Sequence, residues 1–559
     1  MQNIISDLDL SNINTLGDLI VSRIEKTPLE SAVNYYIDEK TIKCDTWQDV
    51  YNKSLSLSAY INLLQAKKIG IFLPTSYSWM LLDNACLLSG LTSLVYHSAW
   101  LAPELSYAIS LDVPDIIICT KDLKTIIEQA LNILSLDILI LVSDEQRSEI
   151  NNIIYNNKIL QYALDKSKFI LAKSIAFTSG TSGLSKGVIL TQKSILASAK
   201  EAYQTVNFNA LNSNMFHWMP LSHVFARVGL YISLMCKGNN YFLRSVNYFS
   251  QDLKLARPSI LFAVPKLMSK MQQQIKLGIT KKHSFMQKFI NLFEQLGYIW
   301  QKLPTPLNLH MQKLQRKLFK PLHEQFGNNL KLLVVGGASI CKTQKQFFEA
   351  IGIRICEGYG MTETSGVVAV QPYNTKNQGS GKFLPSVKTC LSKNNELLIK
   401  GDMLLEGYLP VNDYKLNDWL NTGDVVKIEN GYLSITGRTK EIIITKNGEN
   451  IHPVKIENLL QMHDYIEDSC IVGDNQNSLL ALIVVKKQYN QQQNLTQEIK
   501  LHLSKINKDL PRFEKIFDYI IVPSFIENKL VTITHKKRRN SILSYHAEEI
   551  NNFYIKKNI

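Results

Sequence analysis

Short, uninterrupted apolar runs alternate with longer amphipathic stretches through the first two thirds of the chain. These runs lie at 69–73, 92–96, 115–119, 138–142, 260–264 and 332–335. Continuous apolar runs of this length predict strands that are buried on both faces, and the amphipathic stretches predict the helices that cover them. The pattern therefore indicates an α/β fold with mostly parallel sheets.

Beyond about residue 390 the pattern changes to shorter strands and turns. Residues 425–435 predict a hairpin, because Asn430-Gly431 is a strong signal for a two-residue turn. At 559 residues the chain is too long for one ordinary core, so two or more domains are expected.

The chain is basic, with 62 Lys and Arg against 48 Asp and Glu, and this favours an acidic or phosphate-bearing partner. Residues 266–330 hold eleven Lys and Arg but only two Glu, with apolar residues at helical spacing. This segment is either a helical hairpin with a solvated basic face or a surface attracted to anionic lipid. No recognition motif accompanies the charge, so a nucleic-acid partner is not predicted.

The sequence predicts neither a membrane-spanning helix nor a secretory signal. No run of about 18 apolar residues predicts a membrane-spanning helix, and the N-terminal residues lack the pattern of a signal peptide. The eight cysteines are scattered without a Cys-x-x-Cys pair. We expect a cytoplasmic protein, with peripheral attachment to the inner face of a membrane as the alternative.

The clearest candidate for chemistry is Thr178-Ser-Gly-Thr-Ser-Gly-Leu-Ser-Lys186-Gly187, which lies between two apolar runs. Small residues allow backbone N–H groups to surround an anion, and Lys186 adds a positive charge. The order of residues differs from a Walker A loop, which disfavours a P-loop kinase or ATPase. On composition alone, a phosphate-binding loop and an ordinary surface turn explain the segment equally well.

Three further segments carry groups suited to a nucleotide. In Gly358-Tyr-Gly-Met-Thr-Glu-Thr-Ser-Gly366 the aromatic ring can stack on a base, and the carboxylate can hold Mg²⁺. Val334-Val-Gly-Gly-Ala-Ser339 ends a predicted strand in glycines, which leaves bare backbone that a flat ring can approach. Asp424 and Arg438 flank the predicted hairpin, where a carboxylate can accept the ribose hydroxyls and an arginine can reinforce it.

Together these segments resemble the adenylate-forming enzymes, which include acyl-CoA synthetases, luciferases and peptide-synthetase adenylation domains. The resemblance runs from about residue 30 to 540. It implies a large N-terminal domain of several subdomains, 1–437, with mostly parallel sheets flanked by helices and a basic insertion at 266–330. It also implies a small, mobile α+β C-terminal lid, 438–559, and the use of ATP, Mg²⁺ and CoA.

The resemblance also implies roles for individual residues. Lys536 would be the catalytic lysine, Thr362 would contact phosphate, and Glu363 would bind Mg²⁺. His223, in Pro220-Leu-Ser-His-Val-Phe-Ala-Arg227, would border the carboxylate end of an acyl tunnel, and Lys440 would sit at the hinge of the lid. The nucleotide and CoA site would comprise Thr178, Ser179, Gly180, Thr181, Ser182, Gly183, Lys186, Gly336, Gly337, Ala338, Tyr359, Gly360, Asp424, Arg438, Lys440 and Gly448.

Several positions depart from the family pattern. Asn447 stands where relatives often have glycine, and asparagine tolerates the left-handed backbone expected there. Residues 528–540 fit the terminal lysine signature only loosely, so Lys537 is an alternative to Lys536, and a basic surface patch or localisation tag is an alternative to both. Tyr96-His-Ser-Ala-Trp100 departs from the usual Tyr-Pro-Thr and affects the expected acyl pocket.

The Ser-His-Val-Phe form of 222–225 implies a long-chain fatty acid–CoA ligase. Such an enzyme forms an acyl-adenylate from fatty acid and ATP and transfers the acyl group to CoA, releasing AMP and pyrophosphate. One alternative is a fatty acyl-AMP ligase that loads an acyl carrier protein. Another is a non-catalytic, membrane-associated sensor of acyl groups or nucleotides, which the loose fit at 527–540 suggests. Retention of the expected residues argues against this sensor: Thr362, Glu363, Asp424, Arg438 and Lys536.

Overall fold

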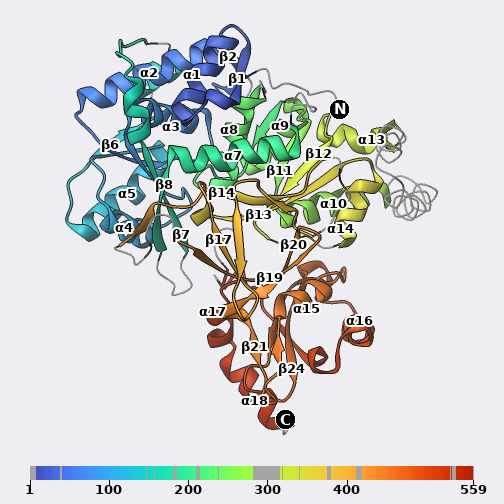
Figure 1. Ribbon diagram of the computed structural model, residues 1–559. Helices are drawn as coiled ribbons and strands as arrows, with labels where there is room; N and C mark the ends of the chain where they lie inside the picture. Colours follow the sequence, from blue (N-terminus) through green and yellow to red (C-terminus); the bar gives the residue numbers. More distant parts are fainter. Residues whose placement is uncertain are drawn as a thin grey trace. The chain divides into compact units, whose positions relative to one another are not determined.

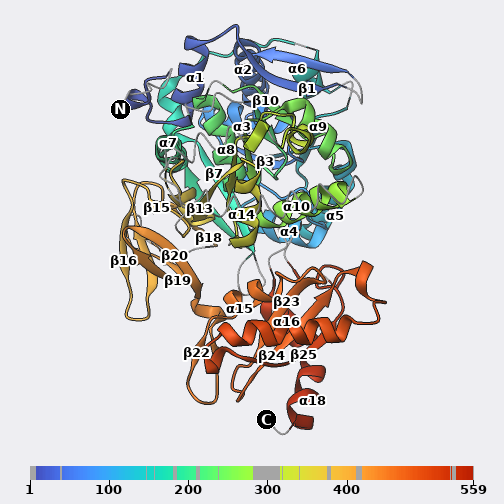
Figure 2. The same ribbon diagram turned by 90° about the vertical axis from the view of Figure 1, so that its right-hand side faces the viewer.

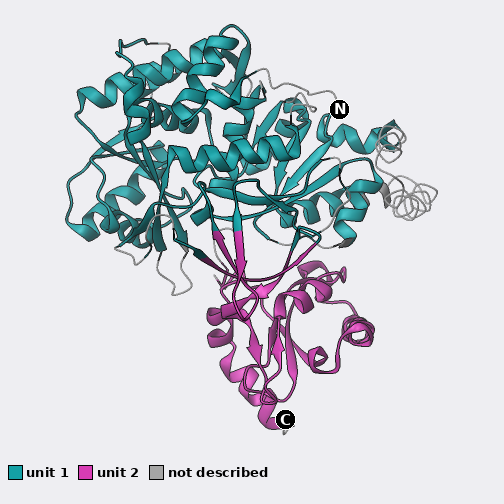
Figure 3. Ribbon diagram, viewed as in Figure 1, with its two compact units in different colours: residues 1–388, 400–420, 430–433 teal, residues 389–399, 421–429, 434–559 magenta. Residues whose placement is uncertain are grey.

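The structure is a computed structural model, and the chain divides into two compact units, coloured in Figure 3. One comprises 1–388, 400–420 and 430–433, and the other comprises 389–399, 421–429 and 434–559. The domain boundary at 437/438 stays a prediction. The structure describes residues 8–37, 41–145, 148–156, 158–179, 185–208, 214–236, 238–280, 315–317, 319–338, 340, 342–373, 375, 379–410, 414, 418–528, 530–531 and 537–557.

The first unit contains a sheet with the strand order β18-β8-β7-β4-β3-β5-β6. Its strands from β7 to β6 pair in parallel, and β8 and β18 are added antiparallel at one edge. The apolar runs predicted as early strands are confirmed. The bounds are β3 (Lys68–Phe72), β4 (Thr92–Val95), β5 (Ile116–Cys119), β6 (Leu139–Val142), β7 (Lys173–Ser179), β8 (Ser185–Thr191) and β18 (Gly407–Leu409).

Another sheet in the same unit runs in the order β15-β14-β13-β12-β11-β9-β10-β1-β2. Its centre, from β13 to β1, is parallel, which confirms the later predicted strands. The bounds are β1 (Ser31–Tyr36), β2 (Ile42–Thr46), β9 (Met215–His217), β10 (Asn240–Phe242), β11 (Ile260–Ala263), β12 (Leu332–Val335), β13 (Arg354–Met361), β14 (Gly366–Val370) and β15 (Lys382–Phe383).

Helices cover these sheets, and α7 contacts β8 of one sheet and β14 of the other (Figure 1). Capping boxes at Thr15, Thr46 and Thr191 satisfy the first N–H groups of α1, α2 and α7. The bounds are α1 (Leu16–Lys26), α2 (Trp47–Leu63), α3 (Tyr77–Ser89), α4 (Ala102–Leu111), α5 (Lys121–Leu134), α6 (Glu149–Tyr155), α7 (Gln192–Val206), α8 (Val224–Met235), α9 (Phe249–Ala256), α10 (Pro265–Thr280), α13 (Lys320–His323) and α14 (Lys342–Ala350).

The second unit is α+β, as expected. Its sheet runs β23-β24-β25, and α16 packs on one face (Figure 2) while α17 and α18 pack on the other (Figure 1). The bounds are β16 (Lys388–Leu391), β17 (Glu396–Lys400), β19 (Leu420–Glu429), β20 (Tyr432–Arg438), β21 (Ile443–Ile444), β22 (Asn450–Ile451), α15 (Pro453–Leu460), β23 (Ile466–Val472), β24 (Leu479–Val485), α16 (Leu495–Asp509), β25 (Ile516–Val522), α17 (Arg539–Tyr545) and α18 (Ala547–Lys557).

The predicted hairpin is confirmed, because β19 and β20 are neighbours joined by Asn430 and Gly431 at φ 51° and 77°. The basic segment 266–330 begins on α10, but its central residues 281–314, with most of the predicted helical hairpin, lie outside the described residues. Within the described residues, no helix is both long enough and apolar enough to span a membrane.

Candidate active site

The predicted phosphate loop is closed by a strand pair. β7 and β8 pair antiparallel, with Thr178 opposite Lys186 and Ser179 opposite Ser185. Four further residues predicted for this loop lie outside the described residues: Gly180, Thr181, Ser182 and Gly183. At Gly187 a Cβ would lie 3.1 Å from side-chain atoms of both Ile175 and Leu409, so the hairpin is packed tightly at its base.

Lys186 belongs to a cluster that includes a residue the sequence did not predict. Its Nζ lies 5.5 Å from the ring centroid of Tyr408, which stands on β18 next to β8. The Tyr408 hydroxyl donates a hydrogen bond to Glu363, and burial together with the Glu363 charge raises the pKa of Tyr408 well above its usual range. Tyr408 therefore links the predicted phosphate-binding lysine to the predicted metal ligand.

The 358–366 segment forms the end of β13, a short turn and the start of β14. The Thr364 hydroxyl accepts from the Met361 N–H at 2.9 Å, and the Ser365 hydroxyl lies 2.9 Å from that of Ser194. Thr364 and Ser365 are buried and hold the turn, whereas Thr362 and Glu363 are half-buried. The turn thus separates structural hydroxyls from two side chains that remain accessible to a ligand.

Two glycines in these motifs are required by close packing. At Gly360 a Cβ would lie 1.7 Å from the Gly366 carbonyl oxygen, where the β13–β14 register shifts. At Gly336 it would lie 3.0 Å from the Phe225 ring. Gly337 has φ +83°, and Gly337 and Ala338 are exposed, as a surface for a flat ring requires. Tyr359, the predicted stacking residue, is 7% exposed.

His223 immediately precedes α8 and is partly exposed. Its ring centroid lies 5.0 Å from that of His97, which follows β4. In the same motif, Arg227 is buried in an ion pair of 2.7 Å with Asp83, so this arginine is part of the core.

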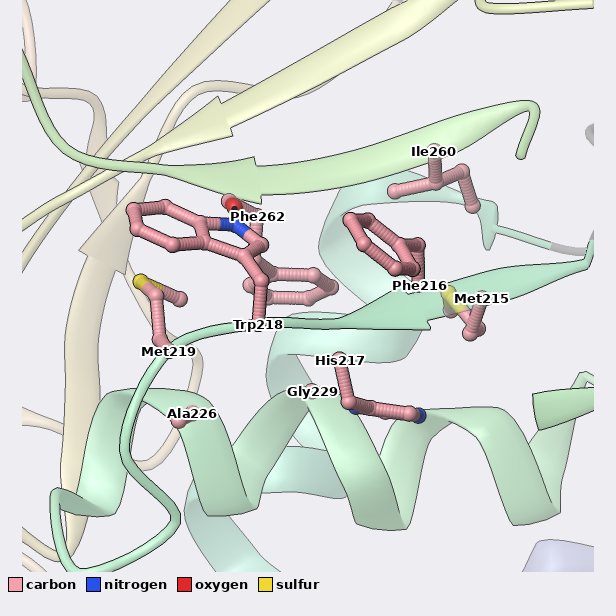
Figure 4. Close-up of a pocket in the computed structure, with 9 residues that line it drawn as sticks. All are labelled: Met215, Phe216, His217, Trp218, Met219, Ala226, Gly229, Ile260 and Phe262. Atoms are coloured by element: carbon pink, nitrogen blue, oxygen red, sulfur yellow. Dashed lines mark hydrogen bonds between the residues drawn. The ribbon is translucent and has the colours of Figure 1, made fainter. Parts of the chain in front are cut away.

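An apolar pocket lies next to this motif, between β9, β11 and α8 (Figure 4). The Trp218 indole N–H donates to the Phe262 carbonyl at 2.8 Å, which fixes the indole across the pocket. A Cβ at Gly229 would lie 3.2 Å from the Phe262 ring, so α8 approaches β11 closely here. The lining residues are Met215, Phe216, His217, Trp218, Met219, Ala226, Gly229, Ile260 and Phe262.

In the second unit the structure brings Asp424 and Arg438 together. Arg438 Nε donates to Asp424 Oδ1 at 2.9 Å, and the Asp424 backbone N–H donates to the Thr422 hydroxyl at 3.1 Å. Asp424 is 3% exposed, while Arg438 is largely exposed. This is the pair predicted for a ribose, held by the neighbouring strands β19 and β20. Lys440 lies in the short 3₁₀ turn that follows β20.

The expectation for Asn447 is wrong. Gly448 is the residue with a left-handed backbone, at φ +78°, and Asn447 has no positive φ. The turn is held by the Gly448 N–H, which donates to the Thr445 carbonyl at 2.9 Å. Glycine therefore stands where the backbone requires it, and asparagine at 447 creates no conformational conflict.

Lys537 is part of a buried ion-pair cluster in the second unit. Its Nζ lies 2.5 Å from Glu457 Oε2, and Arg539 Nη2 lies 2.5 Å from the other oxygen, Oε1. Burial lowers the pKa of Lys537, but Glu457, Asp468 and Cys470 together outweigh burial and raise it. Glu457 is 1% exposed and was not predicted; its only signal is a lone acidic residue on the apolar face of α15. Lys536 lies outside the described residues.

An α/β unit with a Ser/Thr/Gly hairpin loop and a carboxylate turn, followed by an α+β unit, defines the class of adenylate-forming enzymes. The chain belongs to the AMP-binding enzyme family, whose profile matches residues 22–409. The AMP-binding enzyme C-terminal domain matches residues 440–558.

Curated relatives cover most of the chain at low identity. The long-chain-fatty-acid–CoA ligase FadD15 of Mycobacterium bovis is 24% identical over 532 residues, covering 88% of each chain. The chloroplastic long-chain-fatty-acid–acyl-carrier-protein ligase AEE15 of Arabidopsis thaliana is 24% identical over 606 residues, covering 91% of this chain and 82% of that protein.

The fold also matches solved structures. The adenylation domain of a carboxylate reductase from Mycobacterium chelonae superposes with a TM-score of 0.76 at 17% identity, covering 98% of this chain and 92% of that one. At this identity the likeness shows the fold alone.

Proposed function

We propose that this adenylate-forming enzyme activates long-chain fatty acids and transfers the acyl group to CoA. The observation that carries the proposal is the 220–227 motif, in which His223 stays partly exposed at the start of α8, as a group beside an acyl carboxylate should. The apolar pocket beside this motif has a volume of only about 10 Å³ and does not itself hold an acyl chain. The names of the relatives support the same substrate class.

In the first step a carboxylate oxygen attacks the α-phosphorus of ATP, and pyrophosphate leaves. The 178–187 hairpin loop binds the departing phosphates, with Lys186 supplying positive charge. Asp424 and Arg438 bind the ribose, and Tyr359 with Gly336, Gly337 and Ala338 borders the adenine. Lys536 neutralises the charge that develops as the new bond forms. The nucleotide is thereby held while the carboxylate approaches.

Glu363 and Thr362 fit a Mg²⁺ site. Both side chains carry oxygen donors and stay half-buried at the end of β13, and Glu363 is oriented by the hydroxyl of Tyr408. Magnesium commonly takes one or two protein carboxylates and completes its shell with phosphates and water. The described residues contain no cluster of three or more His, Cys, Asp and Glu side chains that would hold a metal alone. Bound there, Mg²⁺ would neutralise phosphate charge.

In the second step the thiol of CoA attacks the acyl carbonyl, the C–S bond forms, and the bond to AMP breaks. The family's mechanism implies that residues 438–559 act as a lid that rotates about Lys440 between the steps. Gly448, in the turn between β21 and β22, then contributes to the thiol channel. Lys536 acts in the first step only.

A panel of acids from short to very long, with ATP and CoA and scored by AMP release, tests the substrate class. Long-chain acids are expected to give the highest kcat/KM. Activity confined to acetyl-sized or aromatic acids would refute the long-chain proposal. Absence of any fatty-acid-dependent ATP–pyrophosphate exchange would favour the non-catalytic sensor.

A fatty acid–carrier-protein ligase is the second candidate, favoured by the relative from Arabidopsis thaliana. Both acceptors end in the same phosphopantetheine thiol, so the nucleotide site does not distinguish them. Parallel assays with free CoA and with a phosphopantetheinylated acyl carrier protein separate the two. Faster transfer to CoA supports the first candidate.

Peripheral attachment to anionic membranes through residues 266–330 is a separate proposal. The excess of lysine there, interleaved with apolar residues, would draw the segment to acidic headgroups. Co-flotation with phosphatidylglycerol vesicles that is lost in high salt would support it, and equal flotation with neutral vesicles would contradict it.

Narrowing the proposed acyl path beside residues 220–227 is expected to shorten the preferred acyl chain. Ala226 is 5% exposed and lines the pocket, so Ala226→Phe should lower kcat/KM for long-chain acids by at least about tenfold relative to short acids. The ratio of the two rates is the measurement, and Ala226→Ser, which keeps the space, is the control. An unchanged ratio in Ala226→Phe would place the acyl chain elsewhere.

A further inference from the structure

His97 occupies a position at which two sheets of the first unit meet. It follows β4 of one sheet, while His223 lies between β9 of the other sheet and α8. The two imidazole centroids are 5.0 Å apart with planes inclined by 59°. His97 is 7% exposed and His223 is partly exposed, so a ligand that reaches His223 comes next to His97.

The hydrogen bonds of His97 define its tautomer. The Ala99 backbone N–H donates to His97 Nδ1 at 3.2 Å, so Nδ1 is the acceptor nitrogen. Burial lowers the pKa of His97 to about 4, so the ring is neutral near pH 7. A neutral imidazole with an acceptor at Nδ1 carries its proton on Nε2. His97 therefore presents Nε2–H as a donor.

That donor has no protein acceptor among the residues that the structure describes. A buried N–H without an acceptor is destabilising, and such groups are few in native proteins. The hydroxyl of Ser222, adjacent to His223, is also buried without a partner in the described chain. One unsatisfied polar group thus belongs to the residue that precedes His223, and another to the ring that lies next to it.

The backbone beside His223 is held in place and does not supply the missing acceptor. The Thr75 hydroxyl donates to the Met219 carbonyl at 2.7 Å and accepts from the Leu221 N–H at 3.0 Å. These bonds tie the loop before α8 to the chain that follows β3. The His97 turn is held separately, because the Trp100 N–H donates to the His97 carbonyl at 2.9 Å and the Ala99 N–H donates to His97 Nδ1.

We propose that His97 binds the substrate carboxylate: its Nε2–H donates to a carboxylate oxygen of the fatty acid, beside His223. The chain on both sides of His97 is anchored by aromatic packing, since Tyr96 stacks on Phe177 at 5.4 Å and Trp100 meets Phe177 edge-on. A neutral N–H donor stabilises the carboxylate anion less than an ion pair with a cation would. The carboxylate therefore stays nucleophilic. The inference rests on the proposed fatty-acid substrate.

Three substitutions test the donor. His97→Leu removes it, His97→Asn places an amide only at the δ position, and His97→Gln restores an N–H near the ε position. In fatty-acid-dependent ATP–pyrophosphate exchange, Leu and Asn are expected to raise the KM for fatty acid about ten- to hundredfold, with the KM for ATP unchanged. Gln should recover most of the loss. The Gln–Asn pair keeps the comparison informative if His97→Leu fails to fold.

Binding supplies a second readout. An acyl-sulfamoyl adenosine carries the acyl carbonyl oxygen, whereas an alkyl ester of AMP lacks it. The wild-type protein should bind the acyl compound more tightly than the alkyl ester. In His97→Asn this ratio of affinities should fall by about the factor by which the KM for fatty acid rises. Equal weakening of both compounds, or no recovery in His97→Gln, would overturn the proposal. Absence of fatty-acid activation by the wild type would instead refute the proposed function.

Discussion

Replacement of Lys536 by alanine is expected to slow adenylate formation by about 10²- to 10³-fold, as loss of one preorganised electrostatic group typically does. Thiolysis of a supplied acyl-adenylate should stay near the wild-type rate, because the role proposed for this lysine ends when pyrophosphate departs. Pyrophosphate release and acyl-CoA formation from synthetic acyl-adenylate measure the two steps separately. Equal loss in both steps would refute the assignment.

Lys537→Ala is the matched control for this experiment. Lys537 Nζ lies 2.5 Å from Glu457 and donates to the Ser469 carbonyl at 2.6 Å, so its charge is already engaged. We expect Lys537→Ala to lower stability while the folded fraction retains adenylation. Loss of adenylation in Lys537→Ala with unchanged stability, together with an active Lys536→Ala, would move the catalytic role to Lys537.

Glu457→Ala is expected to destabilise the second unit by about 3–5 kcal/mol. Glu457 is 1% exposed, and its removal leaves the partly buried cations Lys537 and Arg539 without their shared carboxylate. Hydrogen exchange of the β23 and β24 amides in the full chain measures the loss locally. Glu467→Ala, on the exposed side of β23, is the control and should change stability by less than about 0.5 kcal/mol.

The same cluster predicts a dependence on pH. Burial raises the pKa of Glu457, but Lys537 and Arg539 outweigh it and hold the pKa below the ordinary value of 4.5. A depressed carboxyl pKa contributes stability above that ordinary value, and the contribution is lost as pH falls through the folded-state pKa. The difference between wild type and Glu457→Ala should therefore shrink in acid. A difference that stays constant down to pH 2 would contradict the ion-pair explanation.

The local features of the fold could be predicted because their causes are local. The Asn430-Gly431 turn follows from the left-handed backbone that both residues adopt, and the apolar runs from 69–73 to 332–335 form the buried parallel strands. The prediction for Asn447 was wrong because a resemblance placed the left-handed residue one position early. The backbone instead uses the glycine beside it, Gly448.

The contacts of the site could not be predicted, because they depend on which strands become neighbours. Tyr408 reaches Lys186 only because β18 pairs with β8, and no local pattern around Gly407 indicates that pairing. His97 could be identified as a departure from a family motif. Its nearness to His223 arises from the way two separate sheets meet.

The sequence by itself determined the class of enzyme and predicted most of the groups proposed to bind the nucleotide. These requirements are short range: glycines for close backbone approach, small hydroxylated residues for phosphates, and a carboxylate for a metal ion. Only the tertiary structure decided which charged side chains form ion pairs and which buried polar groups lack a hydrogen-bond partner. Lys537 is engaged by Glu457, 80 residues away, while His97 Nε2 keeps an unused proton among the described residues. Burial and long-range strand pairing set those properties, and neither is encoded in a local motif.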